Sequence, residues 1–212
     1  MAKKVPIAVI RRLPRYFRYI TKLFEKNTAK ISSQSLADDM QITASQIRQD
    51  FNHFGGFGQQ GYGYNVTTLR QEISQILGVN EQFTAVIIGI GNLGNAIANN
   101  VNFAKRGVKV LALFDSDSGK IGKKCGEHVI KDVNLIGDFC KETLPDIAIL
   151  TVPSVAVPEM FFKLKELGIK GFWNFSSAEL KTGNGAVVEN VHLGDGLMLL
   201  TYSLRELKEE EK

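Results

Sequence analysis

The most constraining stretch of this chain is a short apolar run, Val86–Ile88, that leads into three glycines at the spacing Gly89-x-Gly91-x-x-Gly94. The pattern predicts a buried parallel strand, a tight turn and the start of a helix. In such a unit the first glycine permits the turn, Gly91 lets the backbone approach a pyrophosphate, and Gly94 allows close packing of helix on strand. The diphosphate would lie on free N–H groups at the helix N-terminus. We therefore predict a dinucleotide site, against the plainer reading of a tight turn.

A carboxylate follows at the distance expected for ribose binding. The segment Val108–Phe114 predicts a second strand, and Asp115, 21 residues after Gly94, ends it. Such a residue accepts hydrogen bonds from ribose hydroxyls. Because Asp115 would repel a 2′-phosphate, we predict NAD⁺/NADH as the cofactor in preference to the 2′-phosphorylated form. In the polar loop that follows, Lys120 is expected to approach the adenosine.

Two later segments predict strands that end at the same edge. The first, Leu144–Val152, reaches this edge with Thr151-Val152-Pro153. The second, Lys170–Phe175, reaches it with Asn174-Phe175-Ser176. Ligands of doubly wound sheets bind at the carboxyl ends of the strands. The predicted cofactor-binding residues are Gly89, Ile90, Gly91, Asn92, Leu93, Gly94, Asp115, Ser116, Lys120, Ile121, Thr151, Val152, Pro153, Asn174 and Phe175.

The same strand ends argue against an enzyme. Hydride transfer needs an acid or base beside the nicotinamide, usually His, Lys or Tyr. The strand ends offer Thr151, Asn174 and Ser176, His192 lies only on the next segment, and no Tyr-x-x-x-Lys motif occurs. We predict a pocket that binds a nicotinamide cofactor without using it. The alternative is an NAD-dependent oxidoreductase whose N-terminal domain only dimerises.

Length and composition exclude several classes of protein. The 212 residues suffice for one large or two small domains, and no apolar run approaches the roughly 18 residues of a membrane span. The N-terminus lacks the apolar core of a signal peptide. Cys125 and Cys140 have no ligand or redox spacing, so we expect no metal, no disulfide and a cytoplasmic location.

The charge is uneven along the chain. Residues 1–80 hold 11 Lys and Arg against 5 Asp and Glu, a net charge of +6, whereas residues 81–212 hold 15 against 17, a net charge of −2. A basic domain of this kind suits a polyanion such as nucleic acid. A solvated basic surface is an equal alternative on charge alone.

The N-terminal third predicts a series of short helices. Residues 5–27 have apolar side chains at three- and four-residue spacings, but Pro14 lies inside, so we expect two short helices or a kink. A second helix begins at Ser32-Ser33, where a serine can serve as N-cap, and breaks near Gln41.

A third helix has the character of a DNA-reading helix. Thr43 and Gln46 form a capping box, and Ile47, Phe51 and Phe54 form a buried stripe. The opposite face carries Ser45, Arg48, Gln49 and Asn52. Arg reads guanine, and Gln or Asn reads adenine, in the major groove. The second and third helices thus predict a helix-turn-helix, against the alternative of an ordinary three-helix bundle with a polar face.

Glycines interleaved with aromatics over residues 54–64 predict a β-hairpin, the wing of a winged helix. Its tip, Gln59-Gln60, would reach the minor groove or the phosphates. Base readout is assigned to Arg48 and Gln49, and salt-sensitive phosphate contact mainly to Arg11, Arg12, Lys3 and Lys4. The predicted DNA-binding residues are Arg11, Arg12, Ser32, Ser33, Ser45, Gln46, Arg48, Gln49, Gln59 and Tyr62.

Residues 193–207 predict a C-terminal helix with an apolar stripe of Leu197, Leu200, Leu204 and Leu207. The stripe is broader than a surface helix needs. The helix either packs on its own sheet or makes a dimer contact, and paired DNA-reading domains favour the dimer.

Taken together, the motifs resemble the redox-sensing transcriptional repressor Rex family over nearly the whole chain. The segments that carry the resemblance are Arg12-Leu13-Pro14-x-Tyr16-x-Arg18, Thr43-x-Ser45-Gln46-Ile47-Arg48-x-Asp50-Phe51, Phe54-Gly55-x-Phe57-Gly58-x-x-Gly61-Tyr62-Gly63-Tyr64, Gly89-x-Gly91-Asn92-Leu93-Gly94, Leu150-Thr151-Val152-Pro153 and Gly168-Ile169-Lys170-Gly171-x-x-Asn174-Phe175. The resemblance implies a homodimer on pseudo-palindromic operator DNA, with a domain-swapped C-terminal helix. It implies repression of fermentation and respiration genes when NAD⁺ prevails and release from the operator by NADH.

The chain departs from the family pattern at two positions. The family typically has Tyr where this chain has Asn100, and Asp where it has His192. In the family those two residues, with an Arg matching Arg18, link cofactor state to domain arrangement. We therefore assign the switch to Arg18, Asn100 and His192, with Asp195 one turn on as a substitute carboxylate. A paralogue with an altered redox response, or a regulator with a structural, non-sensing NAD, is the alternative.

The predicted organisation is α/β. Residues 1–80 form a winged helix-turn-helix domain, residues 81–192 a Rossmann domain for NAD(H), and residues 193–212 the dimerisation helix.

Overall fold

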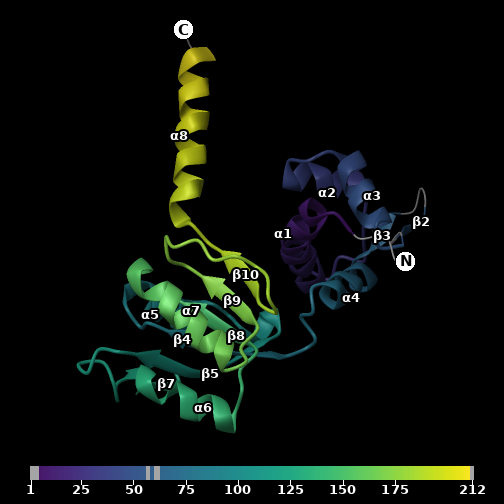
Figure 1. The fold of residues 1–212 in the computed structure, drawn as a ribbon. Coiled ribbons are helices and arrows are strands. Elements are labelled where there is room, and N and C mark those ends of the chain that lie inside the picture. Colours follow the sequence, from purple (N-terminus) through teal and green to yellow (C-terminus); the bar gives the residue numbers. More distant parts are fainter. Residues whose placement is uncertain (1–4, 56–57, 60–62, 211–212) are drawn as a thin grey trace. The chain divides into compact units, whose positions relative to one another are not determined.

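The computed structural model describes residues 5–55, 58–59 and 63–210. Contacts divide the chain into two compact units, Met1–Glu81 and Gln82–Lys212 (Figure 1). The elements of unit 1 are α1 (Ile7–Glu25), β1 (Lys30–Ile31), α2 (Ser33–Met40), α3 (Ala44–Asn52), β2 (Gly58–Gln59), β3 (Gly63–Asn65) and α4 (Val66–Ile76).

The first helix, α1, is one continuous helix with Pro14 inside it, so of the two alternatives expected there, two short helices or a kink, the structure does not have the two short helices. Its buried face consists of Val9, Leu13, Tyr16 and Ile20. The ring of Tyr16 meets that of Phe51 edge-on, and Phe51 meets Tyr64 in the same way, with centroids 5.1 and 5.2 Å apart. One aromatic stack thus joins α1, α3 and the hairpin strand β3 in a single core.

A helix-turn-helix and a wing lie on this core. Ser32 caps α2, Gln41 ends it in the left-handed conformation, and Thr43 caps α3 by accepting a hydrogen bond from the Gln46 N–H at 3.2 Å. The expected hairpin is present as the antiparallel pair β2–β3, and β1 adds a third strand on the other side of β3.

Unit 1 also buries a charged group that sequence reasoning did not single out. Asp50 of α3 has no exposed surface, and its carboxylate accepts hydrogen bonds from Arg12 (2.6 and 2.7 Å), Tyr16 (2.7 Å) and Gln46 (2.9 Å). Burial raises the pKa of Asp50, but these hydrogen bonds outweigh it, so the pKa lies below its ordinary value. The ionised carboxylate therefore joins α1 to α3.

Unit 2 is a seven-stranded sheet in the order β10-β9-β8-β4-β5-β7-β6, parallel except for the β6–β7 pair. Its strands are β4 (Phe83–Ile88), β5 (Val108–Asp115), β6 (Lys124–Cys125), β7 (His128–Asp132), β8 (Ile147–Leu150), β9 (Gly171–Asn174) and β10 (Val187–Asn190). Without the added β6, this is the doubly wound order 3-2-1-4-5-6, which reverses between β4 and β8. A ligand crevice is expected at that switch point.

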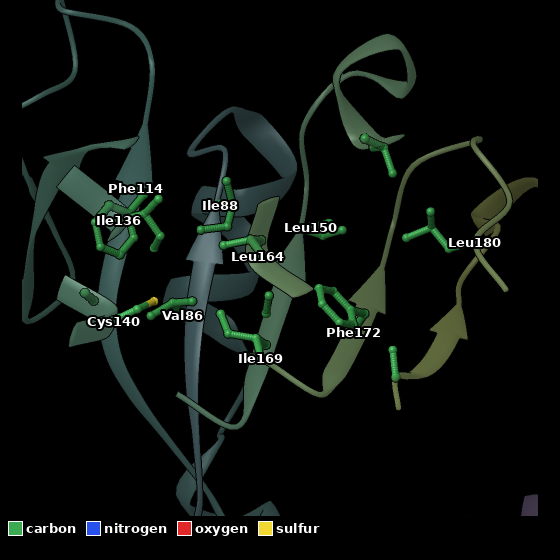
Figure 2. Packing of buried hydrophobic residues seen from close by; sticks show 14 residues of the cluster. Val86, Ile88, Phe114, Ile136, Cys140, Leu150, Leu164, Ile169, Phe172 and Leu180 are labelled. Atoms are coloured by element: carbon green, nitrogen blue, oxygen red, sulfur yellow. The ribbon is translucent and has the colours of Figure 1, made fainter. Parts of the chain in front are cut away.

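Helices cover both faces of the sheet because alternate residues of its buried strands point to opposite sides. On one face, Val86, Ile88 and Phe114 pack against α6 and α7 (Figure 2). On the other, Ile87 and Leu113 pack near Ile97 of α5. The remaining elements are α5 (Asn92–Asn100), η1 (Ala104–Arg106), η2 (Val133–Leu135), α6 (Ile136–Glu142), η3 (Ser154–Ala156), α7 (Val157–Glu166) and α8 (Leu193–Glu210).

The last helix, α8, has no buried residue. It follows β10, whose last residue Asn190 is paired in register with Asn174 of β9, so α8 begins at the carboxyl edge of the sheet (Figure 1). Leu197, Leu200, Leu204 and Leu207 are each 48–63% exposed. The alternative in which α8 packs on its own sheet is therefore not what the structure has.

The buried carboxylate generates a stability prediction. Asp50→Asn should lower the free energy of unfolding of unit 1 by about 2–4 kcal/mol at pH 7, because Arg12 and Tyr16 lose an ionised acceptor. Since the folded pKa of Asp50 is lowered, its contribution is present above about pH 4 and disappears as the pH falls through the folded pKa.

Amide hydrogen exchange of α1 and α3 at pH 7 measures the effect, with urea unfolding between pH 7 and pH 3 for the pH dependence. Asp38→Asn, at an exposed carboxylate on α2, is the matched control and should shift stability by less than about 0.5 kcal/mol. Equal protection of α1 in the two variants would contradict the role assigned to Asp50.

Candidate cofactor and DNA-binding sites

The glycine loop between β4 and α5 is held in a close contact that excludes side chains. A Cβ on Gly94 would overlap the carbonyl oxygen of Gly89 and lie 2.7 Å from Oγ1 of Thr151. Gly89 has φ +91°, and a Cβ there would lie 2.9 Å from the carbonyl oxygen of Thr151. The hydroxyl of Thr151 donates to the carbonyl oxygen of Gly89 at 2.6 Å, with Ile88 as a second acceptor at 3.0 Å. The end of β8 is thus joined to the turn that starts α5.

The first turn of α5 is arranged to receive an anion. A Cβ on Gly91, the N-cap residue, would meet nothing within 4 Å, and no side chain caps the helix. Asn95 donates the first intrahelical hydrogen bond, to Gly91 at 2.9 Å, so the N–H groups of Asn92, Leu93 and Gly94 precede it. Open space over Gly91 and N–H groups at a helix N-terminus fit a pyrophosphate. The predicted loop residues therefore share one site.

Asp115 has a different immediate role from the predicted one. Its carboxylate is nearly buried and accepts from the N–H of Ile90 (2.6 Å), the N–H of Asp117 (2.8 Å) and the ammonium of Lys120 (3.2 Å). Burial raises the pKa of Asp115, but the two backbone hydrogen bonds and Lys120 outweigh it and hold the pKa below its ordinary value. The carboxylate is ionised and supports the glycine loop, while Ser116 and Lys120 keep exposed surface beside it.

The strand ends β8 and β9 complete this edge of the sheet. Thr151, Val152 and Phe175 are half-buried there and Pro153 is exposed. Asn174 is fully buried, and its amide donates to the carbonyl of Ala178 (2.6 Å) and to Asn190 (2.8 Å), while its oxygen accepts from Ser176 (3.1 Å). Its side chain is committed to shaping the loop that follows β9, which leaves half-buried Phe175 as the accessible residue of this pair.

The residues assigned to the switch are not brought together by contacts within one unit. Arg18 is exposed on α1, and Asn100 donates to the carbonyl of Ala96 within α5 at 3.0 Å. His192 pairs with Glu179 at 3.0 Å, and Asp195 is exposed in the first turn of α8. His192 thus has its own carboxylate partner at the cofactor edge.

Helix α3 has the predicted polar face. Ser45, Arg48, Gln49 and Asn52 are exposed, whereas Ile47, Asp50 and Phe51 are buried. Arg48 donates to the hydroxyl of Ser33 at 3.0 Å, so the first residue of α2 orients it. This face presents hydrogen-bonding groups of the kind that read base edges.

Several other residues predicted to bind DNA make contacts within unit 1 or lie outside α3. Arg12 is held by Asp50 in a bidentate ion pair, and Gln46 reaches Asp50 rather than completing the capping box. Ser32 caps α2, and Arg11 is exposed on α1. Gln59 belongs to β2, but its side chain, Tyr62, Lys3 and Lys4 lie outside the described residues. Asp50 and Tyr16 were missed, although a charged residue on the apolar face of α3 was the available signal.

Metal sites and membrane spans were also sought. Within residues 5–55, 58–59 and 63–210, no group of three or more His, Cys, Asp or Glu is placed to hold a metal ion. Over the same ranges no helix has the length and apolarity required to cross a bilayer. Cys125 and Cys140 are buried free thiols.

Family profiles of known sequences match parts of both units. A family profile described as "Putative DNA-binding protein N-terminus" matches residues 4–52, and one described as "CoA binding domain" matches residues 80–178. The redox-sensing transcriptional repressor Rex of Caldicellulosiruptor bescii is 47% identical over 211 residues, which cover 99% of this chain and 97% of that protein. Rex of Clostridioides difficile is 47% identical over 206 residues, covering 97% and 98%.

The chain belongs to the Rex family. Its relatives are repressors and not oxidoreductases, which confirms the prediction that the chain is not an enzyme.

Two solved structures of a Rex-family repressor, RSP, cover 99% of this chain. RSP in complex with NAD⁺ and operator DNA matches with a TM-score of 0.89 and 43% identity over 96% of its own chain. RSP in complex with NADH matches with a TM-score of 0.88 and 40% identity over its full length. The expected α/β fold, with its DNA-binding and Rossmann parts and C-terminal helix, is confirmed.

The loop geometry generates a matched pair of substitutions. Gly94→Ala places a methyl group against the backbone of Gly89, so it should lower stability by about 1–3 kcal/mol and weaken NADH binding. Gly91→Ala meets open space in the free protein, so stability should stay unchanged while NADH affinity falls at least about tenfold, because the methyl group occupies the pyrophosphate's space.

Thermal unfolding and titration of NADH fluorescence measure the two effects. A Gly91→Ala protein that binds NADH as tightly as the wild type would contradict the assignment of this loop to the pyrophosphate.

Proposed function

We propose that this chain is a repressor that binds operator DNA through unit 1 as a dimer and is released when NADH binds at the glycine loop of unit 2. The observation that carries the proposal is the open, uncapped N-terminus of α5 over Gly91, in a chain that also presents an exposed polar recognition helix. Rex-family structures with NAD⁺ and operator DNA, and with NADH, support this pairing of ligands.

On the DNA side, Arg48 and Gln49 would read base edges, and Ser33, Ser45 and Arg11 would contact the backbone or adjoining bases. The wing residues Gln59 and Tyr62 remain assigned to DNA contact on sequence grounds. Arg12 acts through Asp50 by holding α3 against α1, and Gln46 supports the Asp50 carboxylate from within α3. They are positioning residues in this proposal.

On the cofactor side, backbone N–H groups of the first turn of α5 would hold the diphosphate, with Ile90 supported by Asp115. The adenosine would lie near Ser116, Lys120 and Ile121, and the nicotinamide near Thr151, Pro153 and Phe175. NAD⁺ and NADH differ by one charge and by the planarity of the nicotinamide ring. The protein can respond only if its two dimer arrangements bind these forms with different affinities.

The dimer is the finer part of the proposal. Helix α8 carries a four-leucine stripe that its own chain does not cover, and it begins at the cofactor edge. Exchange of α8 between protomers would bury the stripe. It would also connect the cofactor edge of one sheet to the partner protomer. A dimer would hold two copies of α3 about one DNA turn apart, roughly 34 Å, as two half-sites require.

The switch itself is assigned to Arg18, Asn100 and His192, with Asp195 as a nearby carboxylate. Because His192 is not a carboxylate, an Arg18–carboxylate pair cannot form at that position, and Asp195, which is exposed one turn on, is the substitute that we assign. We infer that this chain uses a different set of contacts from that typical of the family to connect the cofactor edge to unit 1.

The test is operator affinity at fixed salt, titrated separately with NADH and NAD⁺. NADH should weaken operator binding by about 5–150-fold, the range of an allosteric coupling, and NAD⁺ should leave it nearly unchanged. Arg48→Ala is the control for the DNA side. It should lose roughly 1–3 kcal/mol of operator affinity and keep wild-type NADH affinity. Equal operator affinity with NADH, with NAD⁺ and without cofactor would contradict the sensing function.

A second experiment tests the dimer. Leu200→Glu combined with Leu204→Glu places two charges on the apolar stripe and should convert a dimer to monomers in sedimentation equilibrium. Arg205→Glu reverses a charge on another side of the same helix, where Arg205 pairs with Glu209, and should leave the dimer intact. A double variant that remains dimeric would show that α8 does not hold the protomers together.

A further inference from the structure

We propose that Lys120 sets the discrimination between NADH and NADPH at the adenosine end of the site, and that it makes the site tolerant of a phosphorylated ribose. The inference rests on the proposed cofactor function. It concerns which dinucleotides the site accepts. From the sequence, that selectivity was attributed to Asp115 alone.

The first observation is that Asp115 is directed into the protein. Its side chain is only 7% exposed, and its two oxygens accept from Ile90, Asp117 and Lys120. One carboxylate has about four acceptor positions, so three are already used before any ribose is bound. The Asp115 carboxylate is therefore largely occupied in supporting the glycine loop. This is the group that we predicted, from the sequence, to repel a 2′-phosphate.

The second observation is that a cation lies beside this carboxylate and has more exposed surface than the carboxylate has. The side chain of Lys120 is 37% exposed, and its ammonium lies 3.2 Å from Oδ2 of Asp115 and 3.7 Å from Oδ2 of Asp117. A ligand approaching Asp115 from solvent meets this ammonium, which carries three donors and no acceptor.

The third observation is that the loop holds Lys120 in place. The N–H of Lys120 donates to the carbonyl of Asp117 at 2.9 Å, and the N–H of Gly119 donates to the Asp117 side chain at 2.8 Å. The N–H of Gly122 then bonds to Ile130 of β7 at 2.8 Å. The lysine is thus presented by a hydrogen-bonded turn anchored to the sheet, and little ordering is needed when a ligand binds.

The charges around the ribose position determine how strongly a 2′-phosphate is repelled. From Asp115 to Lys124 the chain has two Asp and three Lys, a net charge of +1. An ammonium between the two carboxylates offsets their repulsion of a 2′-phosphate and offers it a charge-assisted hydrogen bond. Without Lys120, the same phosphate would face two carboxylates alone.

The experiment compares the Kd of NADH and NADPH, both followed by nicotinamide fluorescence, in the full-length wild-type and variant proteins. Lys120→Met keeps the aliphatic length and removes the charge. It should raise the ratio of the NADPH Kd to the NADH Kd about fivefold or more, whereas Lys120→Arg should keep the wild-type ratio. Lys123→Met removes a charge from an exposed position in the same loop and should also leave the ratio unchanged.

The outcomes separate this inference from the proposed function. NADH binding with the same ratio in the wild type, Lys120→Met and Lys123→Met would overturn the role of Lys120 and leave the cofactor site intact. Failure of the wild-type protein to bind either dinucleotide would overturn both. A ratio changed equally by Lys120→Met and Lys123→Met would show a general charge effect and would also overturn it.

Discussion

The arrangement of unit 2 depends on one close contact between backbone atoms, where Gly94 in the first turn of α5 meets the carbonyl of Gly89. No side chain larger than hydrogen fits between them, so α5 leaves the end of β4 at a single angle. Thr151 adds the neighbouring strand β8 to the same point through its hydroxyl. Because the strand order reverses between β4 and β8, this contact also defines the crevice in which a ligand can reach the helix N-terminus.

Unit 1 depends on a different kind of interaction, a buried carboxylate that α1 and α3 share. Asp50 fixes the rotation of α3 against α1 because Arg12 and Tyr16 of α1 both donate to its carboxylate. The exposed face of α3 is therefore displayed by a rigid element. Each unit has its own core, so a change of cofactor can act on DNA binding by moving whole units rather than by reshaping α3.

The sequence predicted those elements whose local pattern is strong. The glycine motif, the apolar runs of β4 and β5, and the capped helix α3 were found because each has a period or spacing that only one structure satisfies. The strands β7 and β10, which lie at or next to the edges of the sheet, were missed because exposed residues interrupt them and they have no continuous apolar run. Arg12 and Asn174 were assigned to ligands because pattern reasoning cannot show that a distant partner, Asp50 or Asn190, already occupies the side chain.

The central claim is that one protein binds operator and NADH in competing arrangements, so the coupling must be reciprocal. The most direct measurement is the Kd of NADH with and without saturating operator at one salt concentration. The account predicts that operator weakens NADH binding by the same factor by which NADH weakens operator binding. An NADH affinity that operator does not change would contradict it.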